Sequence, residues 1–168
     1  MPTRVLIVDD DQNLCRMIEA FLRAHGFALS WYTSADAAFA AIQAEEFDAV
    51  LTDLNMPGMN GAELCERIVA NRPDVPVVVM TAFGSLETAV AALRAGAYDF
   101  VTKPVEMDML LFAIERAVKH RSLQQEVRKL HEIVDKSTRC EGLIGESTPM
   151  RQLFDRIRRV ADSEVSVL

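Results

Sequence analysis

The sequence is poor in cysteine and has no long apolar run, and both absences exclude whole classes of protein. Its three cysteines, Cys15, Cys65 and Cys140, are widely spaced, and no CxxC pair or histidine cluster accompanies them. Reduced thiols therefore fit better than a disulfide framework or a zinc site. No apolar stretch is long enough to cross a bilayer, and the start of the chain lacks the layout of a signal peptide. We therefore expect a soluble, cytoplasmic protein without a membrane partner.

Positive charge is also scarce. The 18 lysines and arginines are outnumbered by 25 aspartates and glutamates, which gives a formal net charge of −7. Nucleic-acid binding needs a basic surface, so we expect none from this stretch of chain. The hydrophobic share of 50% is typical of a globular protein, and 168 residues suffice for one ordinary domain plus a short additional segment.

Short apolar runs alternate with amphipathic stretches along most of the chain. The runs expected as strands are 5–8, 28–32, 48–53, 76–80 and 98–102. The stretches expected as helices are 13–24, 35–44 after an N-cap at Ser34, 62–71, 86–95 and a long one from Glu106. Such alternation predicts an α/β fold, in which helices cover both faces of a five-stranded parallel sheet.

Polar side chains follow four of these strands at the point where each strand ends. Asp9 and Asp10 follow the first strand, Asp53 ends the third, Thr81 follows the fourth and Lys103 follows the fifth. The carboxyl ends of parallel strands lie at one edge of the sheet, where ligands bind in such folds. We therefore expect these five residues to form one site.

The residue types at this edge suit phosphoryl transfer. A carboxylate such as Asp53 can attack a phosphoryl group and hold it as an aspartyl phosphate. The reaction needs positioning and charge neutralisation, which magnesium bound by carboxylates such as Asp9 and Asp10 can supply. Lys103 offers a further cation and Thr81 a hydroxyl.

Four segments, LIVDDD, VLTDLNMPGMNG, VVVMTAFG and AYDFVTKP, resemble the receiver domain of bacterial response regulators. The resemblance spans Arg4 to about His120, which we interpret as a receiver domain over residues 1–120. It implies a flavodoxin-like (CheY-like) strand order 2-1-3-4-5, a sensor histidine kinase as partner, and Mg²⁺ as the cofactor.

The same resemblance assigns roles around the metal. Asp53 would be the phosphoacceptor. Asp10 and Asp53 would ligate Mg²⁺ together with the backbone carbonyl of Asn55, and Asp9 would hold the ion through water. Without metal, the convergence of these aspartates should raise at least one of their pKa values.

Further roles concern the phosphoryl group itself. By resemblance, Thr81 would contact it, Ala82 would offer a backbone N–H and Lys103 would pair with its oxygen. The Lys103–Pro104 bond would be cis. Phe100 stands at the position of the aromatic switch residue, although core packing is the alternative for this side chain.

Two positions would tune the lifetime of the phosphoryl group. In the family, the residues equivalent to Asn55 and Phe83 influence attack by water. The bulk of Phe83 indicates a fairly long-lived phosphate.

The long helix beyond the receiver has two different apolar stripes. One, suited to packing on the sheet, comprises Leu110, Ile114, Ala117 and Val118. The other alternates spacings of four and three and comprises Leu123, Val127, Leu130 and Val134. The second stripe predicts a short coiled coil over a linker helix at 121–141, and hence a homodimer through this helix and a receiver face. A connector helix without a partner is the alternative.

Residues 142–168 resemble the start of the AAA+ domain in sigma-54-dependent activators of the NtrC class. The chain would then be truncated at the start of that domain, and the full-length protein would contact sigma-54 RNA polymerase and DNA. No GxxxxGK[ST] motif occurs in the sequence. We therefore expect no ATP site in this fragment and no enzyme beyond a receiver that catalyses its own phosphorylation and dephosphorylation.

Three alternatives stay open. The receiver could be coupled to a different output domain, or act alone through protein contacts. A haloacid-dehalogenase-type phosphatase also uses an aspartyl nucleophile, but Asn55 stands where those enzymes carry a second acidic residue. The sequence also leaves open whether phosphorylation makes or breaks the dimer.

Overall fold

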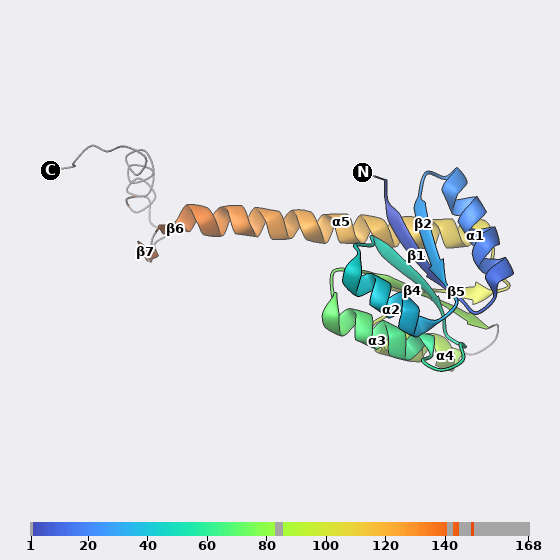
Figure 1. The fold of residues 1–168 in the computed structure, drawn as a ribbon. Helices are drawn as coiled ribbons and strands as arrows, with labels where there is room; N and C mark the ends of the chain where they lie inside the picture. Colours follow the sequence, from blue (N-terminus) through green and yellow to red (C-terminus); the bar gives the residue numbers. More distant parts are fainter. Residues whose placement is uncertain (1, 83–85, 141–142, 145–148, 150–168) are drawn as a thin grey trace. The chain divides into compact units, whose positions relative to one another are not determined.

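The structure is a computed structural model that describes residues 2–82, 86–140, 143–144 and 149 (Figure 1). The chain divides into two compact units, Met1–Leu123 and Gln124–Leu168, which are described separately below. The first unit is an α/β domain and contains every candidate site residue named above that the structure describes.

The first unit is built on a parallel sheet in the predicted order. Its strands are β1 (Arg4–Val8), β2 (Ala28–Tyr32), β3 (Ala49–Asp53), β4 (Val77–Ala82) and β5 (Asp99–Lys103). They lie in the order β2-β1-β3-β4-β5, so the predicted fold class is confirmed. In the ladders Val8 pairs with Thr52 and Asp53 with Met80, which brings the carboxyl ends of the central strands to one edge.

Helices cover both faces of the sheet. They are α1 (Gln12–Ala24), α2 (Ala35–Ala44), α3 (Gly61–Asn71), α4 (Leu86–Arg94) and α5 (Met107–Thr138). Successive side chains of a strand point to opposite faces. Accordingly Val5 and Ile7 pack in a core with α1 and α5, whereas Leu6 and Val8 pack in a core with α2 and α3. Leu110 and Ile114 are fully buried in the first of these cores, as their stripe predicted.

The helix starts show how local chemistry sets the element boundaries. The Asp11 carboxylate accepts hydrogen bonds from the backbone N–H groups of Asn13 and Leu14, which caps α1. Ser34 stands at the predicted N-cap position of α2, but its side chain makes no capping hydrogen bond. Asn60 caps α3, which therefore begins at Gly61, one residue earlier than predicted.

The second unit differs from the prediction at the end of the long helix. We expected the helix to continue to residue 141, but α5 ends at Thr138. Arg139–Cys140 (β6) then pairs antiparallel with Leu143–Ile144 (β7), and a residue in such a ladder cannot continue an α-helix. Most of the stretch 142–168 lies outside the described residues, so its interpretation as an AAA+ fragment stays a prediction. No helix among the described residues is long and apolar enough to span a membrane.

One glycine is required by a close approach of backbone at the site edge. A Cβ added at Gly61 would lie 1.9 Å from the backbone oxygen of Asp53, and the Gly61 N–H already donates to the Leu54 carbonyl oxygen at 3.0 Å. Gly61 thus allows the loop after β3 to fold back against the strand end.

Gly61→Ala should therefore destabilise the domain by about 3 kcal/mol, the upper end for overpacked interiors. Gly26→Ala is the matched control, because Gly26 has φ +88° but nothing within 4 Å of an added Cβ. It should cost only about 1–2 kcal/mol of backbone strain. Urea unfolding measures both, and equal losses would contradict the steric explanation.

Candidate functional site

Three carboxylates converge at the carboxyl edge of the sheet. Asp9 and Asp10 follow β1, and Asp53 is the last residue of β3. One oxygen from each lies within 4.8 Å of the other two. Asp9 is 0% and Asp53 4% exposed, whereas Asp10 is exposed, so the cluster is open to solvent on one side only.

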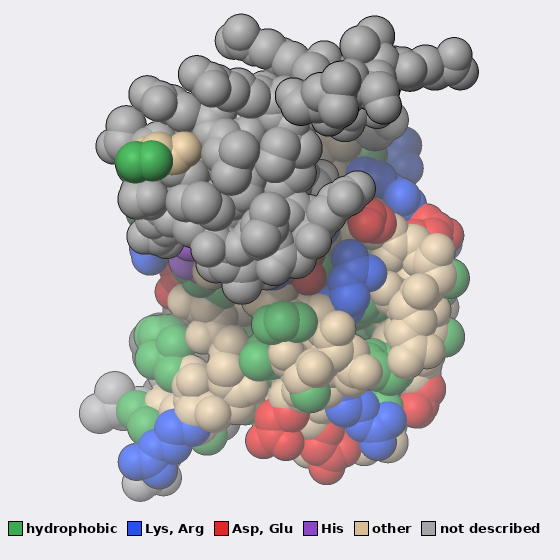
Figure 2. Space-filling view, turned by 90° about the vertical axis from the view of Figure 1, so that its left-hand side faces the viewer, with side chains coloured by type: hydrophobic (Ala, Val, Ile, Leu, Met, Phe, Trp, Pro, Cys, Tyr) green, Lys and Arg blue, Asp and Glu red, His purple; other side chains and the backbone are tan. Residues whose placement is uncertain are grey.

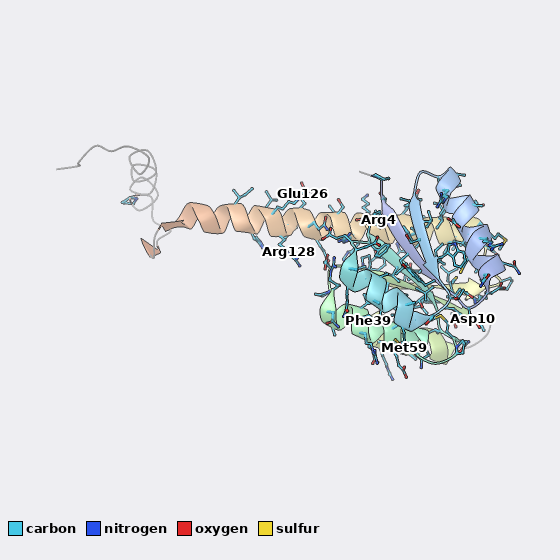
Figure 3. All side chains as sticks on the ribbon, in the orientation of Figure 1. Arg4, Asp10, Phe39, Met59, Glu126 and Arg128 are labelled. Carbon is cyan, nitrogen blue, oxygen red and sulfur yellow. The ribbon has the colours of Figure 1, made fainter. Side chains whose placement is uncertain are left out.

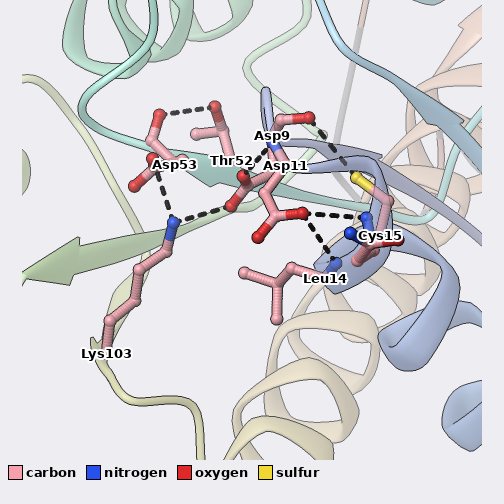
Figure 4. A network of polar contacts seen from close by, with 8 residues as sticks. Asp9, Asp11, Leu14, Cys15, Thr52, Asp53 and Lys103 are labelled. Atoms are coloured by element: carbon pink, nitrogen blue, oxygen red, sulfur yellow. Dashed lines mark hydrogen bonds and ion pairs between the residues drawn. The ribbon is translucent and has the colours of Figure 1, made fainter.

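Lys103 joins the two buried carboxylates (Figure 4). Its Nζ lies 2.8 Å from Asp9 Oδ2 and 3.0 Å from Asp53 Oδ2. The lysine ends β5, two strands away from β3, so the sheet order is what brings the ammonium within reach. The Lys103–Pro104 bond that follows is cis, as the resemblance implied.

Burial and ion pairing shift the pKa values of the charged groups in this cluster in opposite directions. Burial raises the pKa of the Asp53 carboxyl, and the Lys103 ammonium only partly offsets this effect. Burial alone would lower the pKa of Lys103, but its hydrogen bonds to Asp9 and Asp53 outweigh that effect and raise the pKa. The pKa of one aspartate, Asp53, is thus raised, but burial is the main cause and repulsion from Asp9 only a smaller one, whereas the prediction rested on repulsion.

Two contacts that the sequence did not reveal hold Asp9 in place. The backbone N–H of Asp11 donates to Asp9 Oδ1 at 2.9 Å, and the Cys15 thiol donates to the Asp9 carbonyl oxygen at 3.4 Å. Burial, and then the nearby Asp9 carboxylate, raise the pKa of Cys15 to about 11. The thiol therefore stays protonated at neutral pH. The sequence signals this role only through the position of Cys15 in the first turn of α1.

Thr81, Ala82 and Asn55 lie around the same edge. Thr81 is buried and directly follows Met80, the ladder partner of Asp53. Its hydroxyl donates to the Ala82 carbonyl oxygen at 3.4 Å. The backbone N–H of Asn55 donates to the Asp53 carboxylate. All three residues therefore stand beside the carboxylate cluster, but the hydroxyl of Thr81 is directed at its neighbour.

Of the two phenylalanines named in the sequence analysis, the structure describes Phe100 alone. Phe100 is 37% exposed, so the alternative of a core side chain is wrong. It lines a hollow of about 420 Å³ between β5 and α5, together with Met109 and Phe112. Phe83 lies outside the described residues.

The carboxylate cluster fits a hard divalent cation. Such ions prefer carboxylate oxygens and keep several water ligands. The three oxygens are close enough to share one ion, and exposed Asp10 leaves a side through which water can reach it. Two of the carboxylates already share one ammonium group, so the site holds more negative charge than Lys103 can balance.

Comparisons with known proteins agree with this geometry. Residues 5–115 match the family described as response regulator receiver domain. The chain is 35% identical over 164 residues to the C4-dicarboxylate transport transcriptional regulatory protein DctD of Rhizobium meliloti, covering 98% of this chain and 36% of that protein. It is 38% identical, with the same coverage, to the transcriptional regulatory protein ZraR of Salmonella typhimurium. The chain thus spans about a third of the length of these relatives.

Solved structures show the same similarity. NtrX from Brucella abortus, crystallised with ADP, superposes with a TM-score of 0.73 at 34% identity, covering 97% of this chain and 35% of that one. A CheY-like response regulator receiver domain protein from Methanospirillum hungatei gives a TM-score of 0.70 at 31% identity, covering 74% of this chain and 99% of that one.

The electrostatics predict opposite effects of two neutralising substitutions. Because the pKa of folded Asp53 is raised, its charged form destabilises the fold at pH values above the ordinary pKa of 3.8. Asp53→Asn should therefore raise the melting temperature at pH 7 in chelator by a few degrees, on the order of the 2–8 °C that about 1 kcal/mol produces in domains of this size range.

Asp74→Asn is the matched control. Burial raises the pKa of Asp74, but its bonds with Arg121 outweigh this and lower the pKa. The charged form thus contributes stability above pH 3.8, which is lost as the pH falls through the lowered folded pKa. Asp74→Asn should therefore lower the melting temperature. Shifts of the same sign for both variants would refute this account.

Proposed function

The chain belongs to the response regulator receiver family, and on that premise we propose that Asp53 accepts a phosphoryl group from a sensor histidine kinase. The observation that carries the proposal is the convergence of two buried carboxylates and one ammonium group at the edge of the sheet, with Lys103 Nζ 3.0 Å from Asp53. A structural ion pair would need only one carboxylate. The second one and the exposed Asp10 point to a site for a charged ligand.

The reaction is a transfer between two nucleophiles. A carboxylate oxygen of Asp53 attacks phosphorus and forms an O–P bond, while the bond from phosphorus to the kinase's histidine nitrogen breaks. Burial makes this carboxylate more basic and hence more nucleophilic than a solvated one. The Lys103 ammonium, already 3.0 Å from the attacking group, moves little to pair with a phosphoryl oxygen.

Mg²⁺ is the cofactor that we propose for this site. Asp10, Asp53 and the backbone carbonyl of Asn55 would hold it, with Asp9 acting through water. When bound, the ion neutralises charge on the phosphoryl oxygens. Hydrogen bonds from the Asp11 N–H and the Cys15 thiol hold Asp9 in position for this role.

The switch would act through Thr81 and Phe100. A phosphoryl group adds about two negative charges and strong acceptor oxygens. The Thr81 hydroxyl holds its present acceptor at 3.4 Å, which is long for an O–H···O hydrogen bond, so a phosphoryl oxygen competes easily for it. The hollow beside Phe100 offers the ring an alternative position, which would reshape the surface of β5 and α5.

The output that we propose is a homodimer that controls transcription. Apolar side chains are exposed on both proposed contact surfaces. On the receiver face they are Val90, Leu93, Phe100, Met109 and Phe112, and on the linker helix Leu123, Val127, Leu130 and Ile133. The side chain of Val134, the fourth residue of the predicted seam, is not described. The exposed linker stripe supports coiled-coil pairing of two copies.

The names of the relatives indicate the kind of output that this receiver would control. DctD and ZraR are transcriptional regulatory proteins, and a further relative, from Salmonella typhimurium, is the DNA-binding transcriptional regulator NtrC, at 34% identity. We therefore propose that this receiver governs a sigma-54-activating ATPase of the AAA+ class, with sigma-54 RNA polymerase and DNA as partners of the longer protein.

Phosphorylation can be tested directly with radiolabelled acetyl phosphate. The protein should take up label in Mg²⁺ and lose uptake in chelator, and Asp53→Asn should fall to background because the attacking oxygen is gone. Asp36→Asn, an exposed acidic residue in the first turn of α2, should label like the wild type. Undiminished labelling of Asp53→Asn would disprove the assignment.

Dimerisation can be tested by sedimentation equilibrium. The double variant Val127→Glu and Leu130→Glu places two charges on the exposed linker stripe and should shift the protein toward monomer by at least about tenfold in dissociation constant, since 1.4 kcal/mol corresponds to tenfold. Arg128→Glu is the matched control, because it changes the net charge by the same amount as the double variant, −2 (from +1 to −1 at one position). Glu126 and Arg128 project from opposite sides of α5 in Figure 3, and Arg128 lies off the stripe. Equal dissociation of both variants would argue against the seam.

A further inference from the structure

Arg121 is a buried charge that the phosphoryl site does not use. The buried polar side chains among the described residues are Asp9, Thr52, Asp53, Thr81 and Arg121. The first four lie at or beside the carboxyl edge of the sheet. Arg121 belongs to α5 and is 3% exposed, and its partners lie at the opposite edge.

Two loops supply those partners. Arg121 Nη1 lies 2.5 Å from Asp48 Oδ1, and Nη2 lies 3.2 Å from Asp74 Oδ2. Asp48 directly precedes β3, and Asp74 stands in the loop that leads into β4. The guanidinium therefore ties one helix to the amino-terminal ends of the two central strands.

Each partner is itself fixed. The backbone N–H of Arg4, at the start of β1, donates to Asp48 Oδ2 at 2.8 Å. Asp74 Oδ1 lies 3.6 Å from Arg72 Nε. On the side of the molecule that Figure 2 presents, acidic and basic side chains adjoin in the described part of the surface. Arg121 thus joins an ion-pair network rather than a lone carboxylate.

Arg121 stands where α5 passes from its buried part to its exposed part. It is the last buried residue of α5 in the described part of the chain, and every described residue from 122 to 131 is exposed or half-buried. A buried ion pair stabilises a fold little compared with an apolar contact of the same size, but it specifies one geometry. A forked guanidinium fixes both position and rotation of the helix that carries it.

We infer that Arg121 is a positioning residue that anchors α5 to the amino-terminal ends of β3 and β4 and couples the state of Asp53 to the linker helix. β3 and β4 carry Asp53 and Thr81 at their other ends. β3 and β4 pair in register from Val50–Val77 to Asp53–Met80, so a single short ladder of four pairs joins the strand ends near the Arg121 anchor to the strand end that carries Asp53. The coupling half of this inference rests on the proposed function.

The anchor itself is tested in the unmodified protein by amide hydrogen exchange. Arg121→Met removes the charge and keeps most of the apolar volume. It should speed exchange of α5 amides at 113–121 by at least about tenfold, which corresponds to 1.4 kcal/mol of lost local stability. Arg116→Met is the control, because Arg116 is half-exposed and its ion pair with Asp99 at 3.3 Å is a surface contact. Equal exchange in the two variants would overturn the anchor.

Asp48→Asn provides a second variant if Arg121→Met does not fold. The amide oxygen can still accept from the Arg4 N–H, and an NH2 donor then replaces the charged oxygen that faces Arg121. It should speed exchange in the same stretch of α5, and unchanged exchange would equally overturn the anchor.

The coupling is tested by sedimentation with and without beryllofluoride, a phosphoryl mimic. Arg121→Met should retain label uptake from acetyl phosphate but lose the change in dimer dissociation constant that the mimic causes in the wild type. Ile42→Val, a buried change in α2, controls for general loss of stability and should keep the response. A wild-type response in Arg121→Met would refute the coupling. Absence of label in the wild type would instead refute the proposed function and leave the exchange result standing.

Discussion

The contact of one ammonium group with two buried carboxylates is the constraint on which the rest of the first unit depends. Lys103 reaches Asp9 and Asp53 only because β1, β3 and β5 end at the same edge, and they do so because the strands are parallel and in register. Buried charges of this kind persist only when they are paired. The order β2-β1-β3-β4-β5 therefore determines the chemistry of the site as well as the fold.

The backbone around the site is constrained in the same way. Gly61 lets the loop after β3 return to the strand end, where any larger residue would meet the Asp53 carbonyl oxygen. Asp9 is held from the other side by the N–H of Asp11 and the thiol of Cys15. The side chains that would carry the chemistry are thus fixed by neighbours with no part in it, which is how protein sites generally achieve precise geometry.

The sequence predicted the fold well because its signals are local. Apolar runs mark the strands, and polar residues at their ends share an edge in any parallel sheet. Pairings between distant residues have no such signal. Nothing in the spacing of Asp48, Asp74 and Arg121 indicates that they meet. Arg121 continues the helical spacing of the buried stripe, but its charge favoured its assignment to the exposed linker helix. The end of α5 at Thr138 was missed for a related reason, since the ladder of β6 and β7 depends on pairing partners rather than on a helix breaker.

The sharing of Lys103 gives the proposed phosphorylation a route to act as a switch rather than as a local event. Without a phosphoryl group, the ammonium divides its charge between Asp9 and Asp53 at 2.8 and 3.0 Å. A phosphoryl group on Asp53 adds a third anion with about two charges, which competes for the same cation. The ammonium has three N–H donors, but its single positive charge would then be shared among three anions, so its contacts at the ends of β1 and β3 would be redistributed. β5 carries both this lysine and Phe100, and that redistribution would therefore bear directly on the strand beside the exposed apolar surface of α5.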